Sequence, residues 1–280
     1  MSLFVTGGTG FLGSYVLAEL LERPEAGRIF VLTRADDRAA GVDKLWRALQ
    51  LHLDVDRFRA ALARIVLVRG DLHAPQLGLG ARDRARLRDE CESVLHIAAS
   101  LNRKSAKACF NANLRGTLAV VQLAREIAEA RGGLRRFSEV STTAVAGKRE
   151  HENVLEDEAI EWERSDYDPY ARTKKFGEHM VHALLPDVPK TIFRPSTVMG
   201  DSRFARTTQF EMLRIYCLLV DAPAVPTHPD TRLDFVPADF VGHAIAALHL
   251  KERPAHETYH LSAGLGSETV REHAATLRAA

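Results

Sequence analysis

"TGGTGFLG", residues 6 to 13, follows a short apolar run and places four glycines in eight residues. They fit two spacings at once, GxxGxxG through Gly7, Gly10 and Gly13, and GxGxxG when Gly8 replaces Gly7. Such glycines permit a tight turn and a close approach of the backbone to a pyrophosphate, whose charge the next helix N-terminus favours. We therefore predict a dinucleotide-binding turn, with a glycine-rich turn without ligand as the alternative. Its predicted contacts are Thr6, Gly7, Gly8, Thr9, Gly10, Phe11, Leu12 and Gly13.

The end of the second apolar run, "FVLTRADD" at residues 30 to 37, decides which dinucleotide is expected. An NAD enzyme needs an acidic side chain there for the ribose 2′-OH, whereas an NADP enzyme needs a cation for the 2′-phosphate. Arg34 stands at that point, and Asp36 and Asp37 follow slightly later, outside the expected strand end. The sequence therefore favours NADP(H), with an exposed surface charge as the other interpretation of Arg34.

Strand-like apolar runs alternate with helical periodicity as far as Arg194. Short apolar strands separated by amphipathic helices indicate βαβ units and a parallel sheet covered on both faces. The predicted fold class is α/β, a doubly wound parallel sheet of the Rossmann type with a small discontinuous C-terminal substrate lobe. Strands are expected over 3–6, 29–33, 65–68, 93–98, 137–141 and 191–194, and helices over 11–21, 42–53, 82–88, 111–130 and 170–185.

Beyond Arg194 the regular alternation of strand-like and helical segments ends. The pattern predicts a helix over 210–220, a proline-rich loop over 223–229, a turn and helix over 234–250, and a late strand over 258–263. We expect an NADP-binding Rossmann domain over 1–196, continued by about 231–265. Residues 197–230 and 266–280 would form the small substrate-binding lobe.

Composition and charge favour a small-molecule partner. With 38 basic against 37 acidic residues in 280, nothing points to nucleic acid or an anionic membrane surface. Cys91, Cys109 and Cys217 are widely spaced without a completing histidine, so we expect buried thiols and no metal site. The chain has no leader-like start and no apolar run long enough to span a membrane, which predicts a cytoplasmic protein.

A chemical centre is suggested by "DPYARTKKFGEHM", residues 168 to 180, which places Tyr170 and Lys174 four apart on one helix face. The ammonium would lower the pKa of the phenol and make it a usable acid or base. Upstream, Ser141, Thr142 and Thr143 end a predicted strand, where open parallel sheets place catalytic groups. A helix-surface pair and a hydroxyl cluster capping the next turn are the alternatives.

Together these motifs resemble the extended short-chain dehydrogenase/reductases. The resemblance runs from residue 3 to about 265. It includes the glycine motif, "GDL" (70–72), "HIAAS" (96–100), "NANLRGT" (111–117), the Thr142 region, the YxxxK pair with Glu178 behind it, "FRPSTVMG" (193–200) and "LDFVPADF" (233–240).

The resemblance implies roles for individual residues. Thr142, five residues before Gly147, would polarise a carbonyl, Tyr170 would donate a proton, and Lys174 would hold the nicotinamide ribose while tuning Tyr170. Lys44 would add a contact to the 2′-phosphate, although a solvated helix charge explains it equally well. Asp71 and Leu72 would border the adenine, Ala98 and Ala99 the middle of the cofactor, and Pro195 and Val198 the nicotinamide. Asn113 is a further predicted cofactor contact.

The segment between the expected second strand and "GDL" indicates which branch of the superfamily this chain resembles. Its arginine, its long helical insert and the phrase "GDLxxPxLGL" resemble thioester and fatty acyl reductases, including reductase domains of nonribosomal peptide synthetases and carboxylic acid reductases. Sugar-nucleotide epimerases have a shorter span. Two departures are Ala146, where an aromatic residue is common, and a C-terminal lobe that is shorter than in acyl reductases.

The resemblance implies NADPH-dependent reduction of an acyl thioester to an aldehyde, with onward reduction to the alcohol left open. The donor would be acyl-coenzyme A or a carrier-bound acyl group. The alternatives are a reductase or epimerase of a ketone, secondary alcohol or nucleotide sugar, and a non-catalytic NADP-binding regulator. A homodimer through helices 111–130 and 170–185 and a place as a domain in a larger synthase are also implied.

Two further groups carry less weight. His179 and His182 lie three apart on a helix but lack carboxylate or thiol companions for a metal. Apolar residues after 203 could line an acyl pocket, yet such spacing more often marks a core. These residues are Phe204, Phe210, Leu213 and Tyr216.

Overall fold

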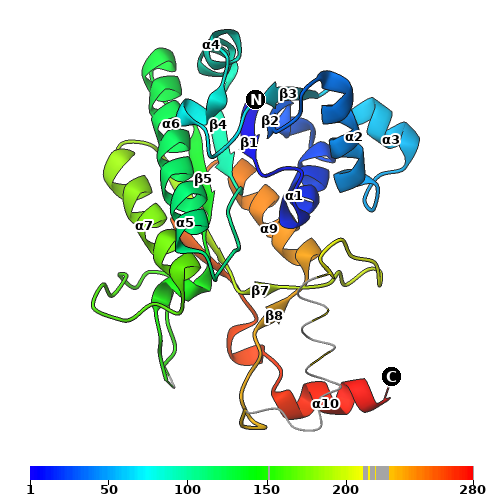
Figure 1. Cartoon of the computed structure of the whole chain (residues 1–280), viewed down its shortest axis with the longest axis vertical. Helices are drawn as coiled ribbons and strands as arrows, with labels where there is room; N and C mark the ends of the chain where they lie inside the picture. Colours follow the sequence, from blue (N-terminus) through cyan, green and yellow to red (C-terminus); the bar gives the residue numbers. More distant parts are fainter. Residues whose placement is uncertain (151, 211–213, 215–217, 219–226, 280) are drawn as a thin grey trace.

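The computed structural model describes residues 1–150, 152–210, 214, 218 and 227–279. In this part of the chain seven parallel strands form one sheet in the order β3-β2-β1-β4-β5-β6-β9 (Figure 1). The order runs outward from β1 in both directions, so a crevice opens between β1 and β4 at their carboxyl ends. The strands are β1 (Ser2–Thr6), β2 (Arg28–Thr33), β3 (Ile65–Arg69), β4 (Ser93–His96), β5 (Arg136–Val140), β6 (Lys190–Pro195) and β9 (Thr258–Leu261).

Helices cover both faces of the sheet, which confirms the predicted doubly wound fold. In Figure 1, α1, α2, α3 and α9 lie on one side and α4, α5, α6 and α7 on the other. None of the described helices is both long and apolar enough to cross a lipid bilayer. Their bounds are α1 (Phe11–Leu21), α2 (Arg38–Leu49), α3 (Val55–Ala61), α4 (Ala81–Glu90), α5 (Ala106–Cys109), α6 (Thr117–Arg131), α7 (Pro169–Leu184), α9 (Ala238–Leu250) and α10 (Val270–Ala279).

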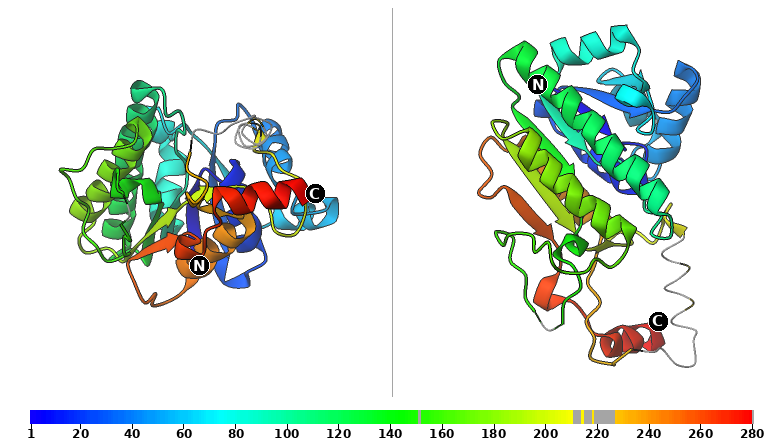
Figure 2. Two further views of the ribbon diagram at one scale, coloured as in Figure 1. Left: turned by 90° about the horizontal axis from the view of Figure 1, so that it is seen from below. Right: turned by 60° about the vertical axis from the view of Figure 1, so that its left-hand side comes forward.

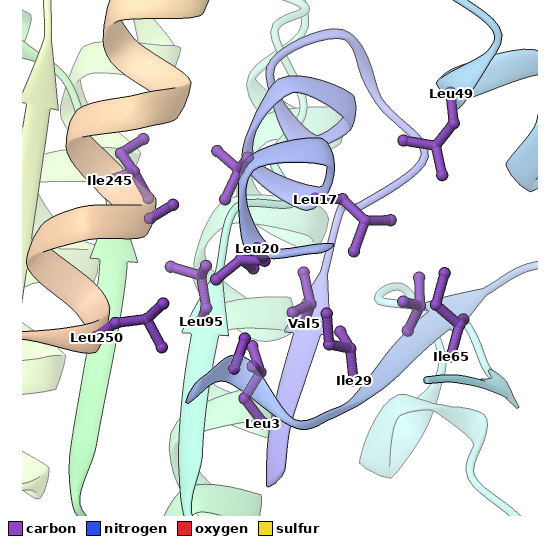
Figure 3. Packing of buried hydrophobic residues seen from close by; sticks show 14 of the residues in the cluster. Leu3, Val5, Leu17, Leu20, Ile29, Leu49, Ile65, Leu95, Ile245 and Leu250 are labelled. Atoms are coloured by element: carbon purple, nitrogen blue, oxygen red, sulfur yellow. The ribbon is translucent and has the colours of Figure 1, made fainter. Parts of the chain in front are cut away.

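The core consists of two apolar layers divided by the sheet. Side chains alternate along a strand, so Leu3 and Val5 of β1 enter the layer under α1 and α9, whereas Phe4 enters the layer under α4 and α6. Figure 3 shows Leu17 and Leu20 of α1 meeting the first layer. Burial on both faces explains why the strands read as continuous apolar runs.

A late helix returns to the first one. Gly242 lets α9 approach α1 closely, because a Cβ there would lie 2.7 Å from Cβ of Tyr15. The last strand, β9, then adds in parallel to β6, with Phe193 opposite Tyr259. The views in Figures 1 and 2 agree that α9 and β9 rejoin the sheet domain.

Side-chain caps fix where several helices begin. The carboxylates of Asp37, Asp54 and Asp168 accept hydrogen bonds of 2.8 Å from the backbone N–H three residues later. Each cap satisfies one of the unpaired amides of a first turn. The cap at Asp168, followed by Pro169, sets the start of α7 and therefore the orientation of Tyr170.

Two predicted helices differ from those observed. The helix expected over 42–53 ends at Leu49, and Asp54 begins a separate helix, α3, by capping it. The helix expected over 111–130 is interrupted by a π-helical segment, Phe110–Gly116, between α5 and α6. This wider turn accompanies a buried Asn113 whose amide bonds outside the helix, a contact that periodicity does not reveal.

Residues near the carboxyl edge of the sheet form a smaller unit. Strands β7 (Thr197–Val198) and β8 (Phe235–Val236) pair in parallel, and Arg232 bridges to Thr269 just before α10. Figure 1 shows α10 beyond that edge of the sheet. Most of the helix predicted over 210–220 and of the loop over 223–229, with Leu213, Tyr216 and Cys217, lies outside the described residues.

The other two cysteines are buried free thiols, as predicted. Burial raises the pKa of Cys91 to about 12 and also raises the pKa of Cys109. Neither thiol is therefore ionised near neutral pH, and both serve as small apolar groups of the core.

Candidate functional site

The glycine turn after β1 has no room for side chains at two positions. A Cβ on Gly13 would lie 1.9 Å from the Gly7 carbonyl oxygen. Gly7 itself has a φ of +78°, and a Cβ there would lie 2.6 Å from the Ala98 amide nitrogen. The turn is closed by a 2.9 Å hydrogen bond from the Gly10 N–H to the Gly7 carbonyl. The glycine spacing is therefore required by backbone-to-backbone contact.

Helix α1 begins at this turn without a protecting side chain. Gly10 is its exposed N-cap, no side chain caps it, and its first turn has no acidic residue. The first-turn amides of Phe11, Leu12 and Gly13 are therefore available to an anion, and the helix dipole favours one. The cradle fits a pyrophosphate, with Thr9 half-buried beside it.

The turn after β4 meets the glycine turn at the crevice of the sheet. The Thr6 hydroxyl accepts a 3.3 Å hydrogen bond from the Ala98 N–H and lies 2.6 Å from Nδ1 of His96. The other His96 nitrogen lies 3.0 Å from the Thr117 hydroxyl. Burial, followed by the Lys174 charge, lowers the pKa of His96 to about 3. A neutral histidine thus ties the two turns together and leaves half-buried Ala98 and Ala99 at the crevice.

Arg34 is exposed directly after β2, at the place predicted for a 2′-phosphate contact. It lies near Asp71: burial raises the pKa of that carboxyl, but hydrogen bonds from His73 and the charges of His73 and Arg34 lower it overall. Asp36 pairs with Arg69 at 3.8 Å and Asp37 caps α2, so both aspartates have other roles. Among the described residues, no ion pair or hydrogen bond occupies the Arg34 guanidinium.

The remaining predicted cofactor contacts lie at the same edge of the sheet. Half-buried Lys44 lies on α2, the helix after Arg34. Leu72 packs on Gly116, where a Cβ would lie 2.4 Å from Leu72 Cγ. Pro195 is the last residue of β6, and Val198 belongs to β7.

Asn113 is used by the protein itself. Its Oδ1 accepts from the Ser100 N–H at 2.7 Å, and its Nδ2 donates at 3.1 Å to both the Ser100 carbonyl and the Thr173 hydroxyl. The amide therefore fastens the loop after β4 to α7. Its predicted contact with the cofactor stays a prediction.

Thr142, Tyr170 and Lys174 come together at the carboxyl end of β5. Thr142 is the buried N-cap of the turn after β5, and its hydroxyl also hydrogen-bonds that of Tyr170. Lys174 lies one turn after Tyr170 on α7, and both side chains are buried. Helical spacing placed Tyr170 and Lys174 on one face, whereas Thr142 was placed beside them by its position at a strand end and by the resemblance.

The pKa of Tyr170 differs from the expectation. Burial raises it, and this effect exceeds the lowering by Lys174, Arg103 and the Thr142 hydrogen bond. The expected net lowering is wrong in this structure because the phenol is almost fully enclosed. Tyr170 is consequently protonated near neutral pH, the state that a proton donor needs.

Two charged residues of the site were missed by the sequence patterns. The Arg103 guanidinium stacks 4.8 Å from the ring centre of Tyr170 and is held by Asp168 at 2.5 Å. Glu139, on β5, accepts a 3.0 Å hydrogen bond from Lys174 Nζ, and both side chains are buried. Burial alone would lower the pKa of Lys174, but Glu139 and Tyr170 reverse that effect and raise it. Lys174 is therefore an ammonium in the site.

The less weighted residues lie elsewhere. Within the described residues no group of His, Cys, Asp or Glu is placed to hold a metal ion. His182 pairs with Glu257 at 3.0 Å, and His179 makes an edge-to-face contact with Trp162. Phe204 is half-buried under Arg203, and Phe210 is exposed.

Comparison with known proteins shows the family of this chain. A model of the NAD-binding family described as male sterility protein matches residues 5–245. The chain belongs to this family. It is an oxidoreductase of the extended short-chain dehydrogenase/reductase type, from the branch of thioester and fatty acyl reductases, and binds a nicotinamide cofactor.

Proteins similar to this chain include a component of a large synthase and an aldehyde reductase. A component of the linear gramicidin synthase of Brevibacillus parabrevis is 30% identical over 260 residues, 92% of this chain and 5% of that protein. Aldehyde reductase lnaA of Aspergillus flavus is 30% identical over 264 residues, 90% of this chain and 24% of that protein. This chain therefore spans a small part of either relative.

A solved structure extends the likeness across the whole chain. The terminal R domain from the myxalamid PKS-NRPS biosynthetic pathway superposes with a TM-score of 0.87 at 30% identity. The match covers 99% of this chain and 69% of that one.

Proposed function

We propose that this protein reduces an acyl thioester to an aldehyde with NADPH. The observation that carries the proposal is the convergence of Thr142, Tyr170 and Lys174 at the carboxyl end of β5, on the same edge of the sheet as the glycine cradle. Two hydroxyl donors beside an ammonium form a site for a carbonyl that gains negative charge.

NADPH, when bound, supplies the hydride that the carbonyl carbon accepts. The Thr142 hydroxyl orients the thioester carbonyl, and the enclosed Tyr170 hydroxyl gives its proton to the carbonyl oxygen as that oxygen becomes an alkoxide. Collapse of the resulting hemithioacetal breaks the C–S bond, releases the thiol and leaves the aldehyde. Lys174 holds the nicotinamide ribose and keeps positive charge beside Tyr170.

Arg34 supports NADPH as the cofactor. An exposed guanidinium directly after β2 can bind the 2′-phosphate with two parallel hydrogen bonds. The two aspartates that follow have other contacts, because Asp36 pairs with Arg69 and Asp37 caps α2, so neither is assigned to the ribose of an NAD. Lys44 is the proposed second cation for the phosphate, from the adjacent helix.

The kind of substrate is inferred from the relatives. One is a component of a synthase and another an aldehyde reductase, so a carrier-bound thioester and an aldehyde are both supported. We assign acyl binding to the lobe of 197–230 and 266–280, whose described part borders the carboxyl edge of the sheet. The aldehyde reductase relative makes aldehyde reduction the second candidate, as a further step or as the main reaction.

The proposal is tested by following NADPH oxidation with acyl-coenzyme A thioesters, aldehydes and nucleotide sugars as separate substrates. Thioester-dependent oxidation that releases free thiol is the expected result. Turnover of an aldehyde or a nucleotide sugar with no turnover of any thioester would exclude thioester reduction and retain the fold and the site.

A further inference from the structure

We propose that Glu139 is a positioning residue that holds the Lys174 side chain in the catalytic site and fixes its positive charge. The inference rests on the proposed function in one respect: it takes Lys174 as the group that contacts the cofactor ribose beside Tyr170. It concerns a residue on β5 that the motifs leave unassigned.

Strand geometry directs Glu139 toward the catalytic helix. It shares a face of β5 with Phe137, which packs in the layer under α6 and α7. Along α7, positions 170, 174, 177, 178 and 181 are buried and form one stripe facing the sheet. Glu139 and Lys174 meet across these two surfaces with Nζ and Oε1 3.0 Å apart.

The helix makes space for this carboxylate. A Cβ on Gly177 would lie 3.0 Å from Oε1 of Glu139, closer than ordinary packing allows. Gly177 lies in the middle of α7, where alanine would favour the helix by about 1 kcal/mol. A glycine at this position is therefore explained by the volume of the carboxylate opposite it.

The Glu139–Lys174 pair differs from its neighbour one turn later. Glu178 and Arg194 join through both carboxylate oxygens and two guanidinium nitrogens, with contacts of 2.7 to 3.3 Å. Glu139 uses only Oε1, and Oε2 has no hydrogen-bond partner among the described residues. Lys174 donates one of its three N–H groups to Glu139. The other two N–H groups remain for the cofactor ribose and the Tyr170 hydroxyl.

Asn113 does not compete for this role. Its oxygen and both amide hydrogens are bonded to Ser100 and Thr173. Glu139 is thus the residue that accepts a hydrogen bond from Lys174 in the described structure. Without it, a fully buried ammonium would lose its hydrogen-bonded counter-ion.

The charges around the pair determine the sign of the expected effect. Lys174 is faced by Tyr170 and Glu178 from α7, by His96 from β4 and by Glu139 from β5, while Arg194 of β6 neutralises Glu178. Removing the Glu139 charge lowers the pKa of Lys174, because the ammonium then loses the negative neighbour that raises it. Lys174 therefore loses its proton at a lower pH, and the alkaline limb of the reaction moves to lower pH.

The test compares Glu139→Gln with the wild-type protein in two pH titrations. One follows kcat/KM for whichever carbonyl compound the wild-type enzyme reduces, and the other follows the dissociation constant of NADPH by fluorescence. We expect the alkaline limb of both profiles to move down by about one pH unit or more, with the fold retained by circular dichroism. An unchanged limb, or a shift to higher pH, would overturn the proposal.

Asp166→Asn is the matched control. Asp166 pairs at 2.6 Å with Lys175, the buried lysine that follows Lys174, so the same carboxylate-to-amide change removes a structural pair from the same helix. Its alkaline limb should stay at the wild-type pH. An equal shift in this variant would show a general effect of lost charge and would contradict the special role of Glu139.

A second variant, Gly177→Ala, tests the proposal if Glu139→Gln does not fold. Gly177→Ala keeps every charge but displaces the Glu139 carboxylate, so the limb should move in the same direction by a smaller amount. A Gly177→Ala limb at the wild-type pH would then overturn the proposal. Because the NADPH titration needs no acyl substrate, failure of thioesters as substrates would overturn the proposed function alone.

Discussion

The nucleotide region and the proton-transfer region of this molecule are built by different means. The nucleotide region, residues 6–13 with 96–99, is shaped by backbone contacts and by a neutral buried histidine. The proton-transfer region, residues 139–142 with 170–178, buries the Glu139–Lys174 pair and contributes Glu178 to a second pair with Arg194. The first is therefore sensitive to volume and the second to charge.

The two regions therefore tolerate different kinds of substitution. A methyl group cannot be added where two backbone segments are in contact, since neither segment can move unless the strand that precedes it also moves. A charge cannot be removed from a buried pair without leaving its partner uncompensated. Substitutions that change volume and substitutions that change charge should therefore affect the two regions differently.

Gly13→Ala is expected to abolish saturable NADPH binding. The added Cβ would lie 1.9 Å from the Gly7 carbonyl oxygen, so the turn must open and the cradle is lost. Fluorescence titration with NADPH measures the effect. Gly80→Ala is the control, because a Cβ there would have no neighbouring heavy atom within 4 Å. Wild-type affinity in Gly13→Ala would refute the backbone account of the nucleotide region.

Tyr170→Phe is expected to lower kcat by about a hundred- to a thousandfold, because the oxyanion loses its proton donor. The dissociation constant of NADPH should change little, since the ring and its Arg103 contact remain. Steady-state kinetics and a binding titration measure the two quantities. Tyr167→Phe, which alters an exposed tyrosine three residues earlier, should behave as wild type. Full activity of Tyr170→Phe would remove Tyr170 from the reaction.

Arg34→Ala is expected to raise KM for NADPH about ten- to a hundredfold, the loss of one charge-assisted phosphate contact. KM for NADH should remain within about twofold, because NADH has no 2′-phosphate. Arg38→Ala, at the start of α2, controls for loss of an exposed arginine nearby. Equal changes for the two cofactors would contradict the assignment of NADPH.

His249→Gln is expected to have the smallest effect, and only on stability in acid. His249 is buried between Ser138 and Ser93, and burial lowers its pKa from 6.5 to about 3. The unfolded chain binds a proton in that window and the folded one does not, so stability falls as pH drops from 6.5 towards 3. The free energy of unfolding should depend less on pH in the variant, with a slope that is smaller by up to about 1.4 kcal/mol per pH unit.

Chemical unfolding at several pH values measures the slope for His249→Gln, and kinetic constants near neutral pH should match the wild type. His249 lies on α9, outside both regions compared above. A slope equal to that of the wild-type protein would mean that His249 titrates normally in the folded state.

Most of the nucleotide region could be predicted from the sequence because backbone contact demands glycine. Gly7, Gly10 and Gly13 follow one another within a single turn, so their spacing is visible without knowledge of the fold. Tyr170 and Lys174 could be paired for a similar reason, since four residues make one helical turn. Local geometry was sufficient in both cases.

The rest of the proton-transfer region depends on residues far apart in the chain. Glu139 and Lys174 are separated by 35 positions, and no local period links them. A signal was nevertheless present, because "RFSEV" places one carboxylate in a strand expected to be buried on both faces. Arg103 gave no such signal, since its contact with Tyr170 depends on how the loop after β4 folds over α7.

Thioester reduction at this site can be tested by following NADPH oxidation and thiol release together from one acyl-coenzyme A thioester. With wild-type protein we expect both to occur, thiol to appear only in the presence of NADPH, and Tyr170→Phe to slow both by the same factor. Thiol release without NADPH, or NADPH oxidation without thiol release, would contradict thioester reduction at this site.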